Sequence, residues 1–451
     1  MFEFVMIQKL LYLAMCVPLI DLALILRKTK YQLATSRLGT NKDMGRLRGT
    51  DGLILSKKLQ LNFKKTLEGV CVIAPTGEGK TSCLALPNLL SNHLPKCSLV
   101  ISDPKGEQFN LTSEYQRSIG REPILFEPLG NHAKYNPLEY CTDFTEVRNL
   151  ANNLIINGGS GKSGEYFESS GVPLFTSALL QNKSISQAVK FLINSTPIEL
   201  IDTLGNSKNE DVKEQFRIFM KSAESPKTMG SILSTLLTSL QLFTDHNLIV
   251  STSSSSFAPA DLRERPIALF IKYDVSKSNY LSPFLSVFFS QLIEKIMYSK
   301  GLPVFFILDE FQNLGRVPNF ENVVATGRSE EVGFMVCIQN ISKLYDIYGK
   351  NNTTTILNNL KVKCVLPSLS DLEALNYLSN LCGDKDVKTE SITGDKKTHS
   401  TTTKRLLVAD EIRRIDDNRL LIIPHNKFPF LDDQNYYKQL KYFNNIITKP
   451  E

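Results

Sequence analysis

The 451-residue chain contains no tryptophan, only five histidines and no C-x-x-C pair among its eight scattered cysteines. Zinc sites and disulfide frameworks need closely spaced cysteine or histidine residues, so the sequence predicts neither. Cysteines such as Cys71 in VCVIA and Cys337 in FMVCI lie inside apolar runs instead, and we expect reduced thiols in the protein core. The net charge of +6 is small for this length and identifies no partner by itself.

Long apolar runs are also missing, except near the amino terminus. Residues 10–26 read LLYLAMCVPLIDLALIL, contain one charged residue, Asp21, and are followed by RKTKYQ. A membrane span needs about 20 apolar residues, and the apolar residues 4–7 extend this short run. We predict an N-terminal membrane anchor over residues 1–30, with the basic residues after it holding the rest of the chain in the cytoplasm. A buried helix of the core is the alternative.

The remaining sequence predicts an α/β fold with a mostly parallel sheet. Short apolar runs alternate with helix-like stretches from about residue 66, whereas residues 145–257 show helical spacing and end in the serine-rich STSSSSFAPA. We therefore expect a nucleotide-binding domain in two parts, 31–145 and 258–425, with residues 31–60 as a linker and first short strands. We expect an all-helical insertion over 146–257 and a C-terminal tail over 426–451. The polar tract 382–405 indicates an exposed loop or hairpin.

The stretch VIAPTGEGKTS at residues 72–82 predicts a phosphate-binding loop. A buried strand leads into it, glycines allow a close approach to an anion, a lysine and a threonine follow, and a helix-like segment comes next. Alanine stands at the first position, where glycine is usual, which is harmless if the backbone there is ordinary. The residues expected to bind ATP are Pro75, Thr76, Gly77, Glu78, Gly79, Lys80, Thr81 and Ser82.

A second glycine-rich stretch, NGGSGKSG at residues 157–164, lacks the context of a phosphate loop. Isoleucine occupies the first-glycine position, the preceding segment has helical spacing, and GEYFES does not resemble the start of a buried helix. We interpret this stretch as a flexible glycine loop.

The second part of an ATPase site is predicted at residues 303–315, PVFFILDEFQNLG. Here an apolar strand ends in two adjacent acids. We expect Asp309 to hold Mg²⁺ together with the hydroxyl of Thr81, and Glu310 to accept a proton from the attacking water. Lys80 would neutralise phosphate charge, so the sequence predicts an ATP hydrolase.

Several motifs together resemble the TraG-like coupling proteins of type IV secretion and bacterial conjugation. They are APTGEGKT, ISDPKGEQFNLTSEYQRSIG, KYNPLEY, ILDEFQNLGRVPNFENVVATGR, CIQNISKLYDIYG and RLLVADEIRRI. The resemblance implies a RecA-like P-loop core with an inserted all-helical domain, assembled as a homo-hexamer at the inner (cytoplasmic) membrane with its catalytic domains in the cytoplasm. Such a protein recruits relaxase-bound single-stranded DNA or secreted protein substrates to the type IV secretion channel and drives their transfer.

The resemblance also assigns two residues. Gln339, at the end of GFMVCIQ, corresponds to a glutamine that senses the γ-phosphate, and its strand should lie beside the phosphate loop. Arg328, in VVATGRSEE, corresponds to an arginine that reaches the nucleotide of a neighbouring subunit; a surface charge near two glutamates is the alternative. Many members have two membrane helices, whereas this sequence offers one, and the DPKGE motif at 103–107 matches without a physical task that we can assign.

Two other functions remain compatible with the sequence. An FtsK- or HerA-like duplex DNA translocase shares both nucleotide motifs but should lack the helical insertion at this position. A membrane receptor that docks substrates and hydrolyses little ATP is the second alternative. A P-loop kinase is disfavoured because no arginine-rich lid segment follows the core.

Overall fold

The structure is a computed structural model of the full chain, and it describes residues 35–159, 165–393 and 396–439. The predicted anchor at residues 1–30 and most of the rejected glycine stretch lie outside these ranges. Among the helices described, none combines the length and the apolar composition that crossing a bilayer requires.

A nine-stranded sheet forms the centre of the described chain, in the order β11-β10-β7-β1-β6-β5-β2-β4-β3. The seven strands from β7 to β3 are all parallel, and β10 and β11 continue the sheet in antiparallel pairing. The predicted α/β fold with a mostly parallel sheet is therefore confirmed. The strands are β1 (Val70–Ile73), β2 (Ser98–Asp103), β3 (Glu122–Phe126), β4 (Ile267–Lys272), β5 (Val304–Leu308), β6 (Val332–Ile338), β7 (Val362–Val365), β10 (Arg419–Pro424) and β11 (Phe430–Asp433).

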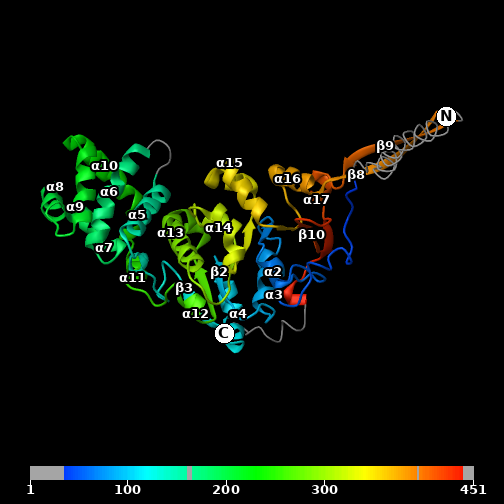
Figure 1. The fold of residues 1–451 in the computed structure, drawn as a ribbon, viewed down its shortest axis with the longest axis horizontal. Helices are drawn as coiled ribbons and strands as arrows, with labels where there is room; N and C mark the ends of the chain where they lie inside the picture. Colours follow the sequence, from blue (N-terminus) through cyan, green and yellow to red (C-terminus); the bar gives the residue numbers. More distant parts are fainter. Residues whose placement is uncertain (1–34, 160–164, 394–395, 440–451) are drawn as a thin grey trace, which may run out of the picture.

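Helices cover both faces of this sheet, which explains why its strands are continuous apolar runs (Figure 1). In β1, Cys71 and Ile73 belong to one core and Val70 and Val72 to the other. The first core includes α13 (Ser278–Met297), α15 (Ile341–Asn359) and α16 (Leu372–Cys382), and the second includes α3 (Leu86–Leu89) and one side of α4 (Glu107–Ser118). The sheet is thus the middle layer of a three-layer core.

A group of helices lies between β3 and β4 in the sequence and to one side of the sheet in space (Figure 1). Its members pack on one another, with α6 in contact with α5, α9 and α10. They fall in the segment for which a helical insertion was predicted, although the domain limits 146–257 stay a prediction. The helices are α5 (Phe144–Gly158), α6 (Glu165–Gln181), α7 (Ile185–Asn194), α8 (Pro197–Leu200), α9 (Glu210–Ser222), α10 (Pro226–Ser239) and α11 (His246–Ser251).

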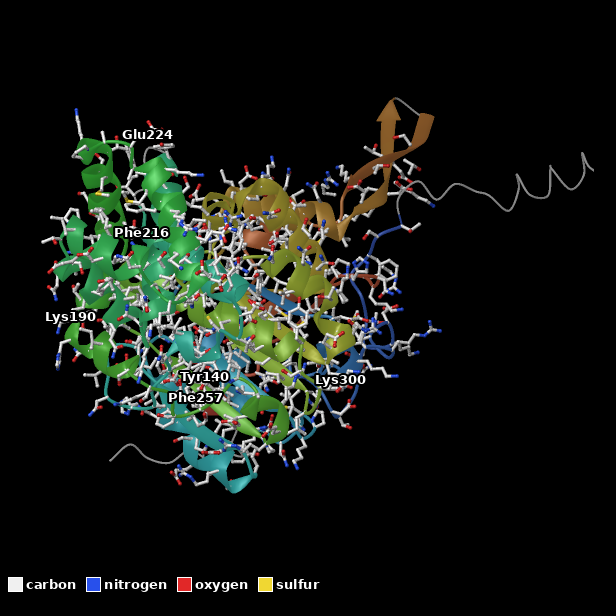
Figure 2. All side chains as sticks on the ribbon, turned by 60° about the vertical axis from the view of Figure 1, so that its left-hand side comes forward. Tyr140, Lys190, Phe216, Glu224, Phe257 and Lys300 are labelled. Carbon is white, nitrogen blue, oxygen red and sulfur yellow. The ribbon has the colours of Figure 1, made fainter. Side chains whose placement is uncertain are left out.

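Aromatic residues join the helical group to the core where the chain enters and leaves it. Figure 2 shows Tyr140, before α5, close to Phe257, after α11, and the Tyr140 hydroxyl donates to the Phe257 carbonyl at 2.7 Å. The buried ring of Tyr135 stacks on both, with centroid distances of 5.1 and 5.4 Å, and its hydroxyl donates to Gln291 of α13. Both crossing points are therefore held together and against the sheet-covering helix.

The two ends of the described chain are more structured than the sequence suggested. Met44, Leu53 and Leu55 are fully buried, so part of the expected linker 31–60 belongs to the core. Part of the expected tail 426–451 is the sheet strand β11, whose Asp432 accepts hydrogen bonds from the Ser56 hydroxyl at 2.6 Å and the Lys58 amide at 2.9 Å. Tertiary packing of these two segments against each other, which no local pattern reveals, overrides their polar composition.

The polar tract forms a protruding hairpin of β8 (Asp384–Thr393) and β9 (Lys396–Arg405), as one of the two predicted alternatives (Figure 1). Its base contacts the start of the described chain, where Thr35 pairs with Lys385 and the Ser36 amide donates to the Asp384 carbonyl.

Arg263 offers a test of this architecture. Its buried guanidinium donates to the carbonyl oxygens of Ile296, Leu302 and Glu330 at 2.7–3.1 Å, which joins the end of α13, the approach to β5 and the approach to β6. Arg263→Met removes the guanidinium donors to the Leu302 and Glu330 carbonyls and leaves the Ile296 carbonyl with backbone donors alone. We therefore expect the free energy of unfolding to fall by about 2–4 kcal/mol in urea titrations.

Arg265→Met is the matched control for this variant. Arg265 is 45% exposed and forms surface ion pairs with Glu122 and Asp261, so its loss should cost less than about 1 kcal/mol. Equal effects of the two substitutions would contradict the joining role of Arg263.

Candidate functional site

The predicted phosphate loop runs from the carboxyl end of β1 into a single π-helical turn, η1 (Thr81–Ala85), and then α3. Gly77 and Gly79 adopt φ values of +91° and +81°, which other residues reach only with strain. Ala74 is fully buried and is not among the residues with positive φ, so alanine is tolerated at the first position as the sequence suggested. Backbone N–H groups of this turn can therefore face an anion.

Lys80 lies at the end of the loop and is only 8% exposed. Its ammonium group donates to the carbonyl oxygens of Ala74 and Pro75 at 3.1 and 3.0 Å, so the side chain folds back across the mouth of its own loop. These two acceptors are neutral and weaker than phosphate oxygens. The same ammonium group is thus placed to exchange them for an anion held by the loop.

Asp309 connects the loop to the second predicted motif. It directly follows β5, and its Oδ2 accepts a hydrogen bond from the Thr81 hydroxyl at 3.0 Å. Burial raises the pKa of this carboxyl, while the charge of Lys80 and the Thr81 hydroxyl oppose the rise. The two motifs, more than two hundred residues apart in the sequence, therefore meet at one point.

The other oxygen of Asp309, Oδ1, is buried and has no hydrogen-bond partner within the described chain. A buried polar atom without a partner is costly, and such atoms in native structures usually await a ligand or serve chemistry. Carboxylate and hydroxyl oxygens are also the ligands that Mg²⁺ prefers. Asp309 and Thr81 therefore fit a Mg²⁺ ion next to a bound phosphate chain.

Glu310 is the most constrained acid of the site. Its φ of +53° is unusual for a residue with a side chain, and its two carboxylate oxygens accept hydrogen bonds from Gln339 at 3.3 Å and Asn313 at 2.8 Å. Positive φ at a bulky residue costs roughly 1–3 kcal/mol and is concentrated at functional sites. Sequence reasoning missed Asn313, although its position three residues after Glu310 in DEFQN was visible.

Gln339 follows β6, which pairs with β1 and therefore lies beside the phosphate loop, as the resemblance implied. A cavity of about 690 Å³ opens at this edge, lined in part by Pro75, Thr76, Gln339 and Lys343. A hollow of about 790 Å³ lies elsewhere, between α5 and the end of α13, and contains no residue predicted to bind ATP. The chemistry of the lining, rather than the volume, favours the smaller cavity as the site.

The DPKGE motif receives a structural explanation. Asp103 ends β2, is 1% exposed, and accepts a hydrogen bond from the Phe109 amide at 2.8 Å in the first turn of α4. Burial raises its pKa to about 6, and the nearby charge of Asp309 adds to the rise. The neighbouring Ser102 hydroxyl donates to the Asp309 carbonyl at 2.8 Å. Asp103 of the motif thus lies near Asp309 and caps the start of α4, while the preceding Ser102 holds the backbone of Asp309.

Arg328 is the one predicted catalytic residue that the structure does not bring to the loop. It precedes β6 and forms an ion pair with Glu68, which precedes β1, at 2.9 Å. Both residues lie at the amino edge of the parallel strands, and the loop lies at the carboxyl edge. The four residues of β1 separate these edges by roughly 13 Å at about 3.3 Å each. Arg328 is 58% exposed, so it can contact another molecule but not its own phosphate loop.

Comparison with known proteins places this geometry in context. A family model described as "Type IV secretory system Conjugative DNA transfer" matches residues 25–450. The chain is 29% identical over 389 residues to protein VirD4 of Rhizobium radiobacter, covering 81% of this chain and 54% of that protein. It is 22% identical over 389 residues to the conjugal transfer protein TraG of the same organism, covering 80% of this chain and 58% of that protein. The chain spans about half the length of these curated relatives.

A solved structure has the same fold. The plasmid coupling protein TrwB, in complex with a non-hydrolysable ATP analogue, superposes with a TM-score of 0.68 at 17% sequence identity, covering 88% of this chain and 93% of that chain. At this identity the similarity establishes the fold alone.

The raised pKa of Asp103 makes stability depend on pH. The folded protein retains a proton up to about pH 6 that the unfolded chain releases near pH 4, so stability should fall as the pH rises between these values. Asp103→Asn keeps an acceptor for the Phe109 amide but cannot ionise. We expect this variant to be more stable than the wild type by roughly 3 kcal/mol above pH 6, with no difference below pH 4, in denaturant titrations across pH.

Asp416→Asn makes the same change at an exposed position and is the matched control; its stability should stay within about 0.5 kcal/mol of the wild type. A constant difference between Asp103→Asn and wild type at all pH values would show that Asp103 does not titrate in this range.

Proposed function

The chain belongs to the type IV secretory system conjugative DNA transfer family, and we propose from this premise that it is a coupling ATPase. It would recruit relaxase-bound single-stranded DNA, secreted protein substrates or both to a type IV secretion channel and drive their transfer by ATP hydrolysis. The observation that carries the proposal is the Thr81–Asp309 hydrogen bond, which joins the phosphate loop to the acid pair.

The site residues have separable tasks in this proposal. Lys80 would leave the carbonyl oxygens of Ala74 and Pro75 for the β- and γ-phosphate oxygens of ATP. Asp309 and Thr81 would hold Mg²⁺, which neutralises phosphate charge when bound. Glu310, oriented by Asn313 and Gln339, would accept a proton from the attacking water.

Arg328 supports an oligomeric form of this proposal. Its exposed guanidinium lies at the edge opposite its own loop, so a role in hydrolysis would require the nucleotide of a neighbouring subunit. We propose a homo-hexamer in which each subunit completes the next site, anchored at the cytoplasmic membrane through residues 1–30. DNA would be gripped mainly through its phosphates, so binding would weaken with salt.

Two substitutions separate binding from hydrolysis. Lys80→Ala removes the phosphate counter-charge and should abolish ATP binding. Glu310→Gln keeps the shape of the side chain but not the base, so ATP should still bind while turnover falls about 100-fold or more. Titration with a fluorescent ATP analogue and a phosphate-release assay measure the two effects, with and without single-stranded DNA.

Glu114→Gln, at an exposed ion pair with Arg117, is the matched control and should retain activity. Turnover that survives in both site variants would overturn the catalytic assignment. Substrate transfer in cells that persists with Lys80→Ala would instead favour the docking receptor, and stimulation by duplex but not single-stranded DNA would favour an FtsK- or HerA-like translocase.

Arg328→Ala tests the contact between subunits. Since the arginine would act on the neighbouring nucleotide, ATP should bind normally while turnover of the assembled protein falls about 10³-fold or more. Mixing Arg328→Ala subunits with Glu310→Gln subunits should restore part of the activity, because some interfaces then combine an intact arginine with an intact base.

Arg413→Ala is the control for this experiment, since Arg413 is similarly exposed and also forms a surface ion pair, with Asp410. If the mixed subunits assembled but recovered no ATPase activity, Arg328 would be a surface charge without a catalytic role.

A further inference from the structure

The segment that follows β11 packs against η1, the helical turn that follows the phosphate loop. Figure 1 shows the segment next to α3 in space, although the two are more than 300 residues apart in the sequence. Gln434 fixes the beginning of the segment, because its side-chain Nε2 donates to the carbonyl oxygens of Asp417 and Arg419, each at 3.0 Å. The short helix η8 (Tyr437–Gln439) ends the described chain and contacts η1.

Tyr437 anchors this segment. Its side chain is only 4% exposed and packs in a small cluster with Leu86, in α3, and Leu90, which follows α3. Leu111 and Tyr115 of α4 close the cluster from the other side. Burial of one aromatic ring contributes roughly 1.5–3 kcal/mol, enough to hold a short segment in one place.

Tyr436, the preceding residue, lies directly against the phosphate loop. A Cβ atom added at Gly79 would come within 2.8 Å of its Cε1 and 2.9 Å of its hydroxyl oxygen. The ring packs against the same core as Cys83 and is half-buried, and this burial raises the pKa of its hydroxyl. The core thus supports the Tyr436 ring from one side, and the exposed remainder of the ring lies beside the phosphate loop.

The sheet order shows which end of a nucleotide this ring would meet. Asp309 and Glu310 come from β5 and Gln339 from β6, all on one side of β1. The γ-phosphate belongs on that side, next to the acids. Tyr436 approaches from the opposite side of β1, where β7, β10 and β11 lie. A phosphate chain held across the loop therefore directs its nucleoside toward Tyr436.

We infer that Tyr436 forms one wall of the nucleoside end of the site and stacks on the base of a bound adenine nucleotide. The inference rests on the proposed function, since it assumes that the loop binds nucleotide phosphates. It extends that function by assigning affinity for the nucleoside to the C-terminal segment, which lies outside both nucleotide motifs. Gly79 is then required twice, for its positive φ and because the tyrosine ring occupies the place of its side chain.

ADP and inorganic pyrophosphate are the probes that isolate this contact, because they share a diphosphate and differ by the nucleoside. In calorimetric titrations of the full-length protein, Tyr436→Ala should weaken ADP binding about tenfold, the loss typical of one base–aromatic stack. Pyrophosphate binding should stay unchanged. Tyr436→Phe keeps the ring and should bind both ligands as the wild type does.

Tyr298→Ala, at an 87% exposed position on another surface, is the control and should bind both ligands normally. Unchanged pyrophosphate binding by Tyr436→Ala also shows that its loop is folded. If Tyr436→Ala weakened the binding of both ligands equally, Tyr436 would only support the loop. If it strengthened both equally, the ring would obstruct the site, and if it changed neither, Tyr436 would not be part of the site. Each of these results overturns the inference. Failure of the wild type to bind either ligand would instead overturn the proposed function.

Discussion

The hydrogen bond from the Thr81 hydroxyl to Asp309 is the contact on which the site depends. It forms because β1 and β5 run parallel, with β6 between them, so that the loop after one strand and the acids after another reach the same edge of the sheet. In a parallel sheet, segments far apart in the sequence meet at this edge by construction, and ligands bind there. The geometry of the site is therefore a property of strand order.

At this edge of the sheet, several carboxylates lie together in a region that is poorly accessible to water. Asp103 and Asp309 are both buried, and burial raises the pKa of each because an ionised carboxylate is poorly solvated there. Lys80 offers the one nearby positive charge among the groups that act on Asp309. The site therefore carries two costs: the burial of its carboxylates and the positive φ of Glu310. A bound cation and phosphate chain would lower the first cost by pairing with these charges.

The ends of the described chain meet beside the phosphate loop, outside the nucleotide motifs. Residues around Ser56 hold β11 through Asp432, and the segment after β11 places Tyr436 against Gly79. On the far side of the sheet, the helical group is joined through Tyr135 to α13, and Arg263 joins α13 to the segment that carries Arg328. Through these contacts, elements without nucleotide motifs position Tyr436 beside the phosphate loop and the segment that carries Arg328 at the opposite edge of the sheet.

The mostly parallel α/β sheet, the loop with Lys80 and Thr81, and the acid pair at 309–310 could all be predicted from the sequence. Each is encoded by local composition: buried strands, glycines and adjacent acids. The resemblance added Gln339, whose strand does lie beside the loop. The three-dimensional contacts were needed to show that Asn313 orients Glu310, that Ser102 bonds the backbone of Asp309, that Arg328 faces away, and that Tyr436, after β11, lies against Gly79. These depend on contacts between segments far apart in the sequence or on the fold of one turn, and a linear pattern carries no information on which distant residues will meet.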